Sequence, residues 1–476
     1  MSYDRNLINL TAVEAVALLR ARRVSAAELV EASAGRITAV EPAINALPIL
    51  CLERAREAAR HAMPGDGPAS LGGLPISVKD LDEVAGVRHT MGGSVLFEHT
   101  VSTVSSPMVE ILEGNGAIPV AKSNSPEFGF NASTINALHG PTRNPYDTRL
   151  TVGGSSGGAA ASVATGEVWL ATGSDLGSSI RLPAAFCGVV GLRPSPGRVP
   201  RARRGMPFST LPVLGPIART VADVALGLDA MVGERWSDPL SLPARPGEFS
   251  AALARPVAPA RVAWSADLGV TPVDPEIAAI CAAAVARFAE AGAAVEEACP
   301  DLSQAVEVFH AIRGVNHLAA FAPLVEAEGA RVIPEIHASL ERARAVPIER
   351  FAWAERERAA MFGRLMDFFE THDVLVCPAA IMPPFPAEWR RVDMLGNHRF
   401  DSYIDWIAIT FAISLLGVPV LSLPVGFTAA GLPVGIQIIG RPRGDAAVLS
   451  AGAVLEQVIG AHGRRPVDPV SPRAAA

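Results

Sequence analysis

Helical patterns and short apolar segments alternate along this chain of 476 residues. Within residues 8–62, Thr11 with Glu14 and Ser25 with Glu28 match N-cap pairs, which predict two helix starts. Further helices are expected at residues 273–292 and 350–372, and strands at residues 76–81, 117–121, 374–378 and 420–424. This alternation predicts an α/β fold with a mixed sheet.

The composition indicates a large buried core and no strongly basic surface. Apolar residues make up 49% of the chain, charged residues 19%, and the net charge is −7. Nucleic acid is not expected as a partner, because binding to its phosphates needs clustered positive charge. Four arginines do gather, Arg198, Arg201, Arg203 and Arg204, and we expect them to form a solvated edge of a loop.

Cysteines and apolar stretches give expectations about location and cofactors. The five cysteines lack C-x-x-C spacing, so neither a disulfide framework nor a zinc site is expected, and no other metal or cofactor is implied. The N-terminus does not match a signal peptide. Residues 407–425 are apolar, but Gly417, Pro419 and Pro424 favour a buried helix and a core strand over a membrane span. A cytoplasmic protein without a membrane span is therefore expected.

Lysine is almost absent from the chain. Of 41 basic residues only Lys79 and Lys122 are lysines, and the others are arginines. Arginine keeps its proton inside a protein, whereas a desolvated lysine can become a neutral amine and act as a base. Lysine-specific chemistry is therefore expected at these two positions, and chance retention is the alternative.

Two segments, residues 153–158 and 173–179, are rich in glycine and serine and have little side-chain volume for packing. Their role is therefore expected in the backbone, which can turn tightly and present N–H groups at one point as an oxyanion site. A helix is expected after the first segment, and a flexible loop is the alternative. Asp175 and Arg181 are expected to brace the second segment as a pair.

A serine in these segments needs a base, and histidine is the usual one. None of the ten histidines lies in either segment, and the nearest, His139, stands beside Gly140 and Pro141 and is expected to be a turn residue. Lys79 is therefore the leading candidate for the base.

Together these residues resemble the pattern of the amidase signature enzymes. That family has a lysine at the end of an apolar strand, a GGSSGG loop and a D-x-G-G-S-[IVL]-R segment. The matching stretches here are residues 78–80, 153–158 and 175–181, with further matches at 121–128, 143–145, 183–194, 215–219 and 431–437. The resemblance implies an α/β fold of the amidase-signature type, with a large mixed, mostly parallel β-sheet core covered by helices on both faces.

The resemblance also implies the site. Ser179 would be the nucleophile that forms an acyl-enzyme, Ser155 a cis-peptide serine that relays protons, and Lys79 the neutral general base. Gly129 and Asn131 match positions that contact the substrate or the relay. The oxyanion hole would be formed by the backbone N–H groups of Leu176, Gly177, Ser178 and Ser179.

The chain departs from the family pattern at Ser178, where glycine is usual. If the backbone there requires positive φ, a serine would cost roughly 1 kcal/mol or more. The departure concerns the shape of the oxyanion turn and leaves the three catalytic candidates unaffected.

One amidase domain over residues 1–476 is expected, with core motifs in about 65–220 and 374–456. The region of about 235–405 is more polar and matches less well, which favours a helical cap that sets substrate specificity. The aromatic candidates for an apolar cleft, with core packing as the alternative, are Phe128, Phe130, Tyr403 and Trp406.

Three functions remain open at this point. The first is a stand-alone amidase that hydrolyses a small or medium carboxamide to a carboxylate and ammonia or an amine. The second is the glutaminase A-type subunit of a tRNA-dependent amidotransferase. The third is a non-catalytic anion-binding or scaffold protein. The expected partner is a small-molecule amide, and the oligomeric state stays open between a monomer and a homodimer.

Overall fold

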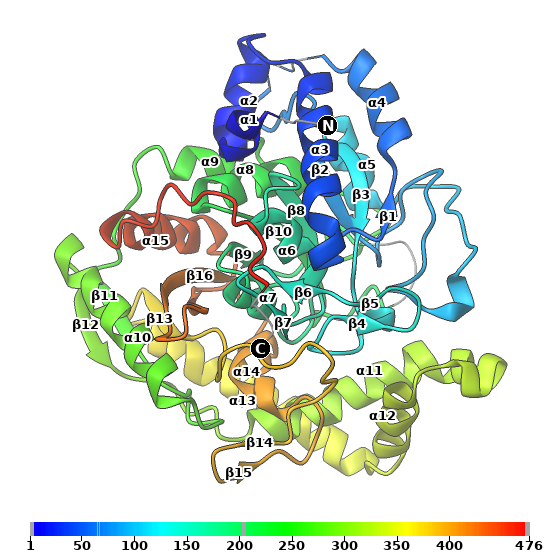
Figure 1. The fold of residues 1–476 in the computed structure, drawn as a ribbon. Coiled ribbons are helices and arrows are strands. Elements are labelled where there is room, and N and C mark those ends of the chain that lie inside the picture. The colour runs from blue at the N-terminus through cyan, green and yellow to red at the C-terminus, as the bar shows by residue number, and fades with distance from the viewer. Residues whose placement is uncertain (1–3, 64, 66, 202–205, 472–476) are drawn as a thin grey trace, which may run out of the picture.

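One large sheet runs through the protein (Figure 1). The computed structural model describes residues 4–63, 65, 67–201 and 206–471. Within these residues the eleven strands of the sheet lie in the order β1 (Ile49–Leu50), β3 (Ile118–Ser123), β2 (Pro75–Lys79), β8 (Leu170–Asp175), β10 (Val213–Ala218), β9 (Val190–Arg193), β16 (Val420–Phe427), β17 (Pro433–Ile439), β13 (Val374–Pro378), β11 (Arg261–Trp264) and β12 (Ala294–Glu297). Three two-stranded pairs lie outside it: β4 (Ile135–Asn136) with β5 (Gly140–Pro141), β6 (Arg143–Asn144) with β7 (Asp147–Thr151), and β14 (Met394–Leu395) with β15 (His398–Arg399).

The strand directions are mixed. Strand β2 is parallel to both β3 and β8, and β11 is parallel to both β12 and β13. The other neighbouring pairs, from β8 through β17 to β13 and between β1 and β3, are antiparallel. The expected mixed α/β sheet is therefore confirmed. The parallel pairing is found in two blocks, β3 with β2 and β8, and β13 with β11 and β12. The strands between these blocks pair antiparallel.

Helices pack on both faces of the sheet. They are α1 (Arg5–Asn9), α2 (Ala12–Arg20), α3 (Ala26–Ile44), α4 (Leu52–His61), α5 (Pro107–Gly114), α6 (Gly157–Ala164), α7 (Arg181–Phe186), α8 (Val221–Met231), α9 (Glu248–Ala252), α10 (Pro275–Ala286), α11 (Ala305–Glu328), α12 (Pro334–Arg344), α13 (Ile348–Phe369), α14 (Ala408–Ser414) and α15 (Asp445–Val458). Gly227 of α8 lies against Pro216 of β10. The residue of β10 that follows Pro216, Ile217, packs near Gly173 and Ile180. Because successive strand residues point to opposite faces, α8 and the start of α7 cover different sides.

Local sequence signals located several elements correctly. Thr11 and Ser25 each form a capping box with the acid three residues later, at the starts of α2 and α3. The apolar stretch of residues 407–425 forms buried α14 and then β16. His139 lies in the turn between β4 and β5, as expected. No helix among the described residues is long and apolar enough to cross a membrane.

The less well matched region of about 235–405 contributes to the sheet as well as covering it. Strands β11 and β12 form one edge of the sheet and β13 connects them to β17. The long helices α11, α12 and α13 pack on one another at the end of the molecule away from α1 to α4 (Figure 1). Helix α11 also contacts α14, and Phe309 of α11 and Phe411 of α14 both lie beside Gly177, which follows β8.

The arginine cluster is not the solvated edge that its sequence suggested. Arg198 is buried and forms an ion pair with Asp445, 3.3 Å between Nε and Oδ2. Arg201 is half-buried and donates to backbone carbonyl groups of the same loop. The expectation was wrong for these two residues because their partners could not be read from local sequence; Arg203 and Arg204 lie outside the described residues.

Candidate active site

Three segments converge at one edge of the sheet. Lys79 is the last residue of β2, and Asp175 is the last residue of β8. Strands β2 and β8 are parallel neighbours, with Ser77 beside Ala171, so their carboxyl ends lie at the same edge. The loop that ends at α6 brings Ser155 to this edge, and the loop between β8 and α7 brings Ser179.

The amine of Lys79 is buried among hydroxyl groups. Its Nζ lies 2.7 Å from Oγ of Ser155, 2.8 Å from Oγ of Ser156 and 3.0 Å from Oγ of Ser174. The side chain is fully buried, and Nζ forms no ion pair with a carboxylate of the described residues. Burial lowers the pKa of Lys79 to about 7, although the more distant charges of Asp82 and Asp175 favour the protonated form.

The glycine-rich segment before α6 follows a path that side chains would obstruct. The peptide bond between Gly154 and Ser155 is cis. Gly153 has φ of +72°, and a Cβ on Gly158 would come within 2.4 Å of the carbonyl oxygen of Ala46. This close approach accounts for glycine at these positions, and helix α6 follows the segment as its alanine-rich sequence predicts.

The segment after β8 has four backbone N–H groups in succession that donate to no described residue: those of Leu176, Gly177, Ser178 and Ser179. The next two N–H groups, of Ile180 and Arg181, both donate to Oδ2 of Asp175. Ser178 is not among the described residues with positive φ, so the backbone cost considered for a serine there does not arise. Its hydroxyl donates to the carbonyl oxygen of Gly154 at 3.4 Å.

Ser179 lies between the two segments. Its carbonyl oxygen accepts a hydrogen bond of 3.0 Å from the backbone N–H of Ser156, which ties the two segments together. Its hydroxyl forms no hydrogen bond with another described residue, and the residue lines a cavity that Ser155 also lines. The link between Lys79 and Ser155 is thus present, whereas the two serine hydroxyls are not hydrogen-bonded to each other.

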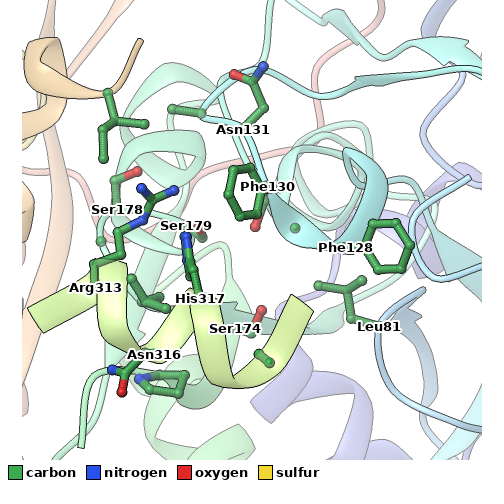
Figure 2. A pocket seen from close by; sticks show the side chains of 18 of the residues that line it. Leu81, Phe128, Phe130, Asn131, Ser174, Ser178, Ser179, Arg313, Asn316 and His317 are labelled. Carbon is green, nitrogen blue, oxygen red and sulfur yellow. The ribbon is translucent and has the colours of Figure 1, made fainter. Parts of the chain in front are cut away.

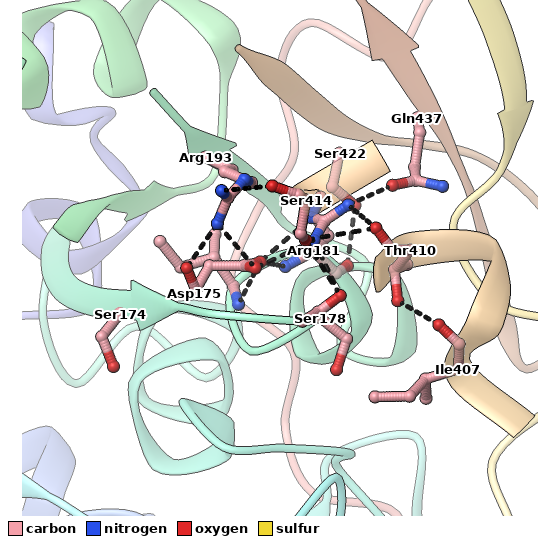
Figure 3. Close-up of polar contacts among 12 residues, drawn as sticks. Ser174, Asp175, Ser178, Arg181, Arg193, Ile407, Thr410, Ser414, Ser422 and Gln437 are labelled. Carbon is pink, nitrogen blue, oxygen red and sulfur yellow. Dashed lines mark hydrogen bonds and ion pairs between the residues drawn. The ribbon is translucent and has the colours of Figure 1, made fainter. Parts of the chain in front are cut away.

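A buried ion network holds the turn in place (Figure 3). Arg181 donates through Nε and Nη2 to both carboxylate oxygens of Asp175, at 3.0 and 2.9 Å, which confirms the expected brace. It also donates to Oε1 of Gln437 and Oγ of Ser414, and a second buried arginine, Arg193, donates to the carbonyl oxygen of Asp175. Burial alone would raise the pKa of Asp175, but the two arginines hold it below its usual range.

The cavity beside Ser179 has a volume of about 310 Å³ (Figure 2). Of the aromatic candidates, Phe128, Phe130 and Tyr403 line it, whereas Trp406 is buried in the core. Gly129 and Asn131 line it as well. Gly129 has φ of +70°, and a Cβ there would lie 3.4 Å from Oγ of Ser155. The amide Nδ2 of Asn131 is buried and has no partner among the described residues.

Sequence reasoning missed several residues of the site. Ser156 and Ser174 contact the amine of Lys79, and their position beside Ser155 and inside the second glycine-rich segment was the available signal. Arg313 and His317 of α11 also line the cavity, and only their helical spacing hinted that they share a face. Among the described residues no group of three or more metal-binding side chains lies together.

The chain is similar to known proteins over nearly its whole length. A family model described as Amidase matches residues 28–449. The acylamidase of Rhodococcus erythropolis is 37% identical over 475 residues, which cover 98% of each chain. The A-type subunit of the glutamyl-tRNA(Gln) amidotransferase of Moorella thermoacetica is 34% identical over 490 residues, 97% of this chain and 99% of that protein. The crystal structure of a bacterial aryl acylamidase of the amidase signature enzymes superimposes with a TM-score of 0.87 at 28% identity, over 97% of this chain and 100% of that one.

Proposed function

The chain belongs to the amidase signature family of hydrolases, and from this premise we propose that it hydrolyses a small or medium carboxamide through an acyl-enzyme. In this proposal Ser179 is the nucleophile, Ser155 relays protons, and Lys79 is the general base. No metal or cofactor takes part in any step.

The observation that carries the proposal is the set of groups around the amine of Lys79. The hydroxyl of Ser156 donates to the carbonyl oxygen of Ser174, 3.3 Å away, so toward Nζ it can only accept. A neutral amine has two N–H donors and one lone pair. A protonated Nζ would donate to all three hydroxyls; in the neutral form its two N–H donors serve Ser156 and Ser174, and the lone pair accepts from the hydroxyl of Ser155. A lysine with its pKa lowered to about 7 is half neutral near pH 7, as a base in this position must be.

The reaction then proceeds by proton transfers over short distances. Substrate binding brings Ser155 into contact with the hydroxyl of Ser179, since catalytic hydrogen bonds often tighten only in the complex. Ser179 attacks the amide carbon as its proton passes through Ser155 to Lys79. The same proton returns along this path to the leaving amine, and water hydrolyses the ester in the second half of the reaction.

The free N–H groups of residues 176–179 are proposed to bind the oxyanion that forms during attack. These N–H groups are preorganised because the carboxylate of Asp175 accepts hydrogen bonds from the next two N–H groups of the turn, and Arg181 holds that carboxylate in place. Such donors stabilise charge that develops in the transition state without reorganisation. Gly129 leaves room beside Ser155, and Asn131 is proposed to contact the substrate at the cavity wall.

A second candidate is a glutaminase subunit that works with partner chains, which the 34% identity to a subunit of an amidotransferase supports. We favour a stand-alone amidase because the identity to an acylamidase is higher and covers the chain equally well. A non-catalytic protein would be expected to lack one of Lys79, Ser155 and Ser179, and all three are present. The five unpaired cysteines are in keeping with a reducing cytoplasm as the place of action.

The test uses the purified chain without other proteins. It is screened against aliphatic, aryl and amino-acid amides, including glutamine, and labelled in parallel with a fluorophosphonate probe whose adduct is located by mass spectrometry. We expect hydrolysis by the chain alone and an adduct on Ser179. The variant Ser179→Ala should lose both, whereas Ser303→Ala, at an exposed serine, should label normally. An adduct on Ser156 would overturn the assignment of the nucleophile, and activity only with partner proteins would favour the glutaminase of an amidotransferase complex.

A further inference from the structure

Helix α11 presents three polar side chains to a cavity that is otherwise rich in aromatic and aliphatic groups. Arg313, Asn316 and His317 stand three and four residues apart in the helix and line the cavity. Figure 2 shows Arg313 and His317 turned toward Phe130, Ser178 and Ser179, whereas Asn316 lies on the other side of the helix, where its Nδ2 donates to Oγ of Ser209 at 3.3 Å. Arg313 and His317 are therefore the side chains of this helix that face a molecule in the cavity, and Asn316 lines the cavity beside them.

Arg313 is held in a fixed orientation. Its side chain is 9% exposed, and its guanidinium lies 4.9 Å from the ring centre of Phe130 and 5.5 Å from that of Tyr403. The two rings are nearly parallel, 19° apart. Nη2 donates to the hydroxyl of Tyr403, and the other N–H groups of the guanidinium donate to no described residue. Most of its hydrogen-bonding capacity is thus unused.

The positive charge of Arg313 has no carboxylate partner among the described residues. Glu335 pairs through Oε1 with Arg390 at 2.9 Å, its Oε2 has no partner among the described residues, and Asp405 pairs with His310 at 2.6 Å. A buried charge without a counter-ion is unfavourable, so such a group is expected to meet an anion during function.

The other arginine of the cavity provides a contrast. Arg201 also lines it, but its Nη2 donates to the carbonyl oxygens of Met206, Pro207 and Ser209, at 2.9 to 3.1 Å. These bonds give Arg201 a structural role in its own loop. Arg313 donates to one hydroxyl group and to no backbone carbonyl of the described residues, so its hydrogen bonds do not indicate a structural role of this kind.

His317 adds a neutral polar group next to this charge. Burial, reinforced by the charge of Arg313, holds the pKa of His317 well below its usual value, so the ring is neutral. Nδ1 lies 2.8 Å from Oγ of Ser339, and Nε2 forms no hydrogen bond with a described residue. Of Arg313, Asn316 and His317, Arg313 therefore carries the positive charge, and a single anionic group on a bound molecule would balance it.

We propose that Arg313, with Asn316 and His317 beside it, forms a subsite for a carboxylate on the substrate, so that the preferred amides are anionic. The inference rests on the proposed amide hydrolysis and specifies its substrate class. A planar guanidinium binds a carboxylate through two parallel hydrogen bonds, and the flanking rings hold it ready at little entropic cost. The apolar remainder of the cavity accommodates the uncharged part of such a substrate.

The test compares pairs of substrates that differ only in charge. On the acyl side, N-phenylsuccinamate is compared with N-phenyl-4-oxopentanamide, and on the amine side 4-acetamidobenzoate is compared with 4-acetylacetanilide. In each pair a methyl ketone replaces the carboxylate at nearly constant shape. For the wild-type chain we expect kcat/KM to favour the carboxylate member of at least one pair by about 100-fold. A ratio near one in both pairs overturns the proposal without any variant.

Variants assign the preference to Arg313. Arg313→Gln should bring the ratio close to one, whereas Arg313→Lys should retain part of it because the charge remains without the planar fork. Arg364→Gln, in α13 outside the cavity, is the matched control and should leave the ratio unchanged. An unchanged ratio in folded Arg313→Gln overturns the assignment.

A binding measurement separates this proposal from the proposed function. Titration calorimetry of Ser179→Ala with N-phenylsuccinamate and 4-acetamidobenzoate should show binding that Arg313→Gln removes. If the wild-type chain hydrolyses neither these pairs nor any amide of the screen described above, but Arg313-dependent binding is found, amide hydrolysis is wrong and the carboxylate subsite stands. If hydrolysis occurs with no preference for a carboxylate, the subsite is wrong and the hydrolase stands.

Discussion

The pH dependence of Ser179 reactivity tests the state of Lys79 directly. An ordinary lysine, with a pKa of 10.5, would be neutral in only ~0.03% of molecules at pH 7, whereas a pKa of about 7 makes half of them neutral. If only the neutral amine activates Ser179, the reaction rate follows this fraction. The rate should then rise about tenfold between pH 6 and pH 8 and level off above pH 8.

The assay is the rate of labelling of Ser179 by a fluorophosphonate, which requires no knowledge of the natural substrate. An unperturbed lysine would instead give a rise of about 100-fold between pH 6 and pH 8 that continues past pH 9. That outcome would refute the neutral resting amine. Because a rate on the free enzyme reports the pKa of its essential groups, the midpoint of the profile is the pKa of Lys79.

A carboxylate near the amine supplies a second check on the same reasoning. Asp82 is buried, its Oδ2 has no partner among the described residues, and its charge favours protonated Lys79. Asp82→Asn should therefore move the midpoint of the labelling profile to lower pH. The control is Asp367→Asn, at an exposed carboxylate of α13, which should not shift it. A shift to higher pH with Asp82→Asn would contradict the electrostatic account.

Three further predictions follow from individual contacts. Lys79→Arg should slow labelling about 10³-fold, because a guanidinium cannot act as a base at neutral pH, and near-normal labelling would exclude the neutral-base mechanism. Asp175→Asn should lower the free energy of unfolding by about 3–5 kcal/mol in urea titrations, because Arg181 is left buried without its carboxylate; a loss below 1 kcal/mol would contradict this. Gly129→Ala should cost about 1 kcal/mol of stability and slow labelling, because φ is +70° and the new Cβ would lie 2.9 Å from Leu81; unchanged labelling would argue against close packing around the relay.

Elements with local signals could be predicted from sequence, and their arrangement could not. The capping boxes of α2 and α3 and the buried strand β13 follow from residues only a few positions apart. The position of β2 between β3 and β8 depends on pairing between segments far apart in the chain, for which a single sequence carries no local pattern. The antiparallel middle of the sheet was missing from the prediction for the same reason.

The site was predictable where chemistry restricts the residue type. Rare lysines and dense glycine-serine segments pointed to Lys79 and to residues 153–158 and 173–179, and the resemblance to the amidase signature enzymes implied Ser155 and Ser179 within them. The structure brings these three segments to one edge of the sheet, and the catalytic roles of their residues stay predictions. The partners of arginine were not predictable in this way. Arg198 pairs with Asp445, which is distant in the sequence, so a loop arginine that reads as solvated is in fact buried.

The two lysines are equally buried and differ in the kind of partner that surrounds the amine. Both side chains are fully buried. Nζ of Lys122 donates to Oδ1 of Asp80 at 2.8 Å, and burial of that carboxylate is outweighed by His89 and Lys122, which hold its pKa below the usual range. Lys122 is thus paired directly with an anion. Lys79, one residue before Asp80, is surrounded by hydroxyl groups, which solvate an amine without supplying a negative charge. Desolvation of Lys79 is then offset only by more distant carboxylates, and this lowers its pKa to about 7, as the proposed proton transfer from a serine requires.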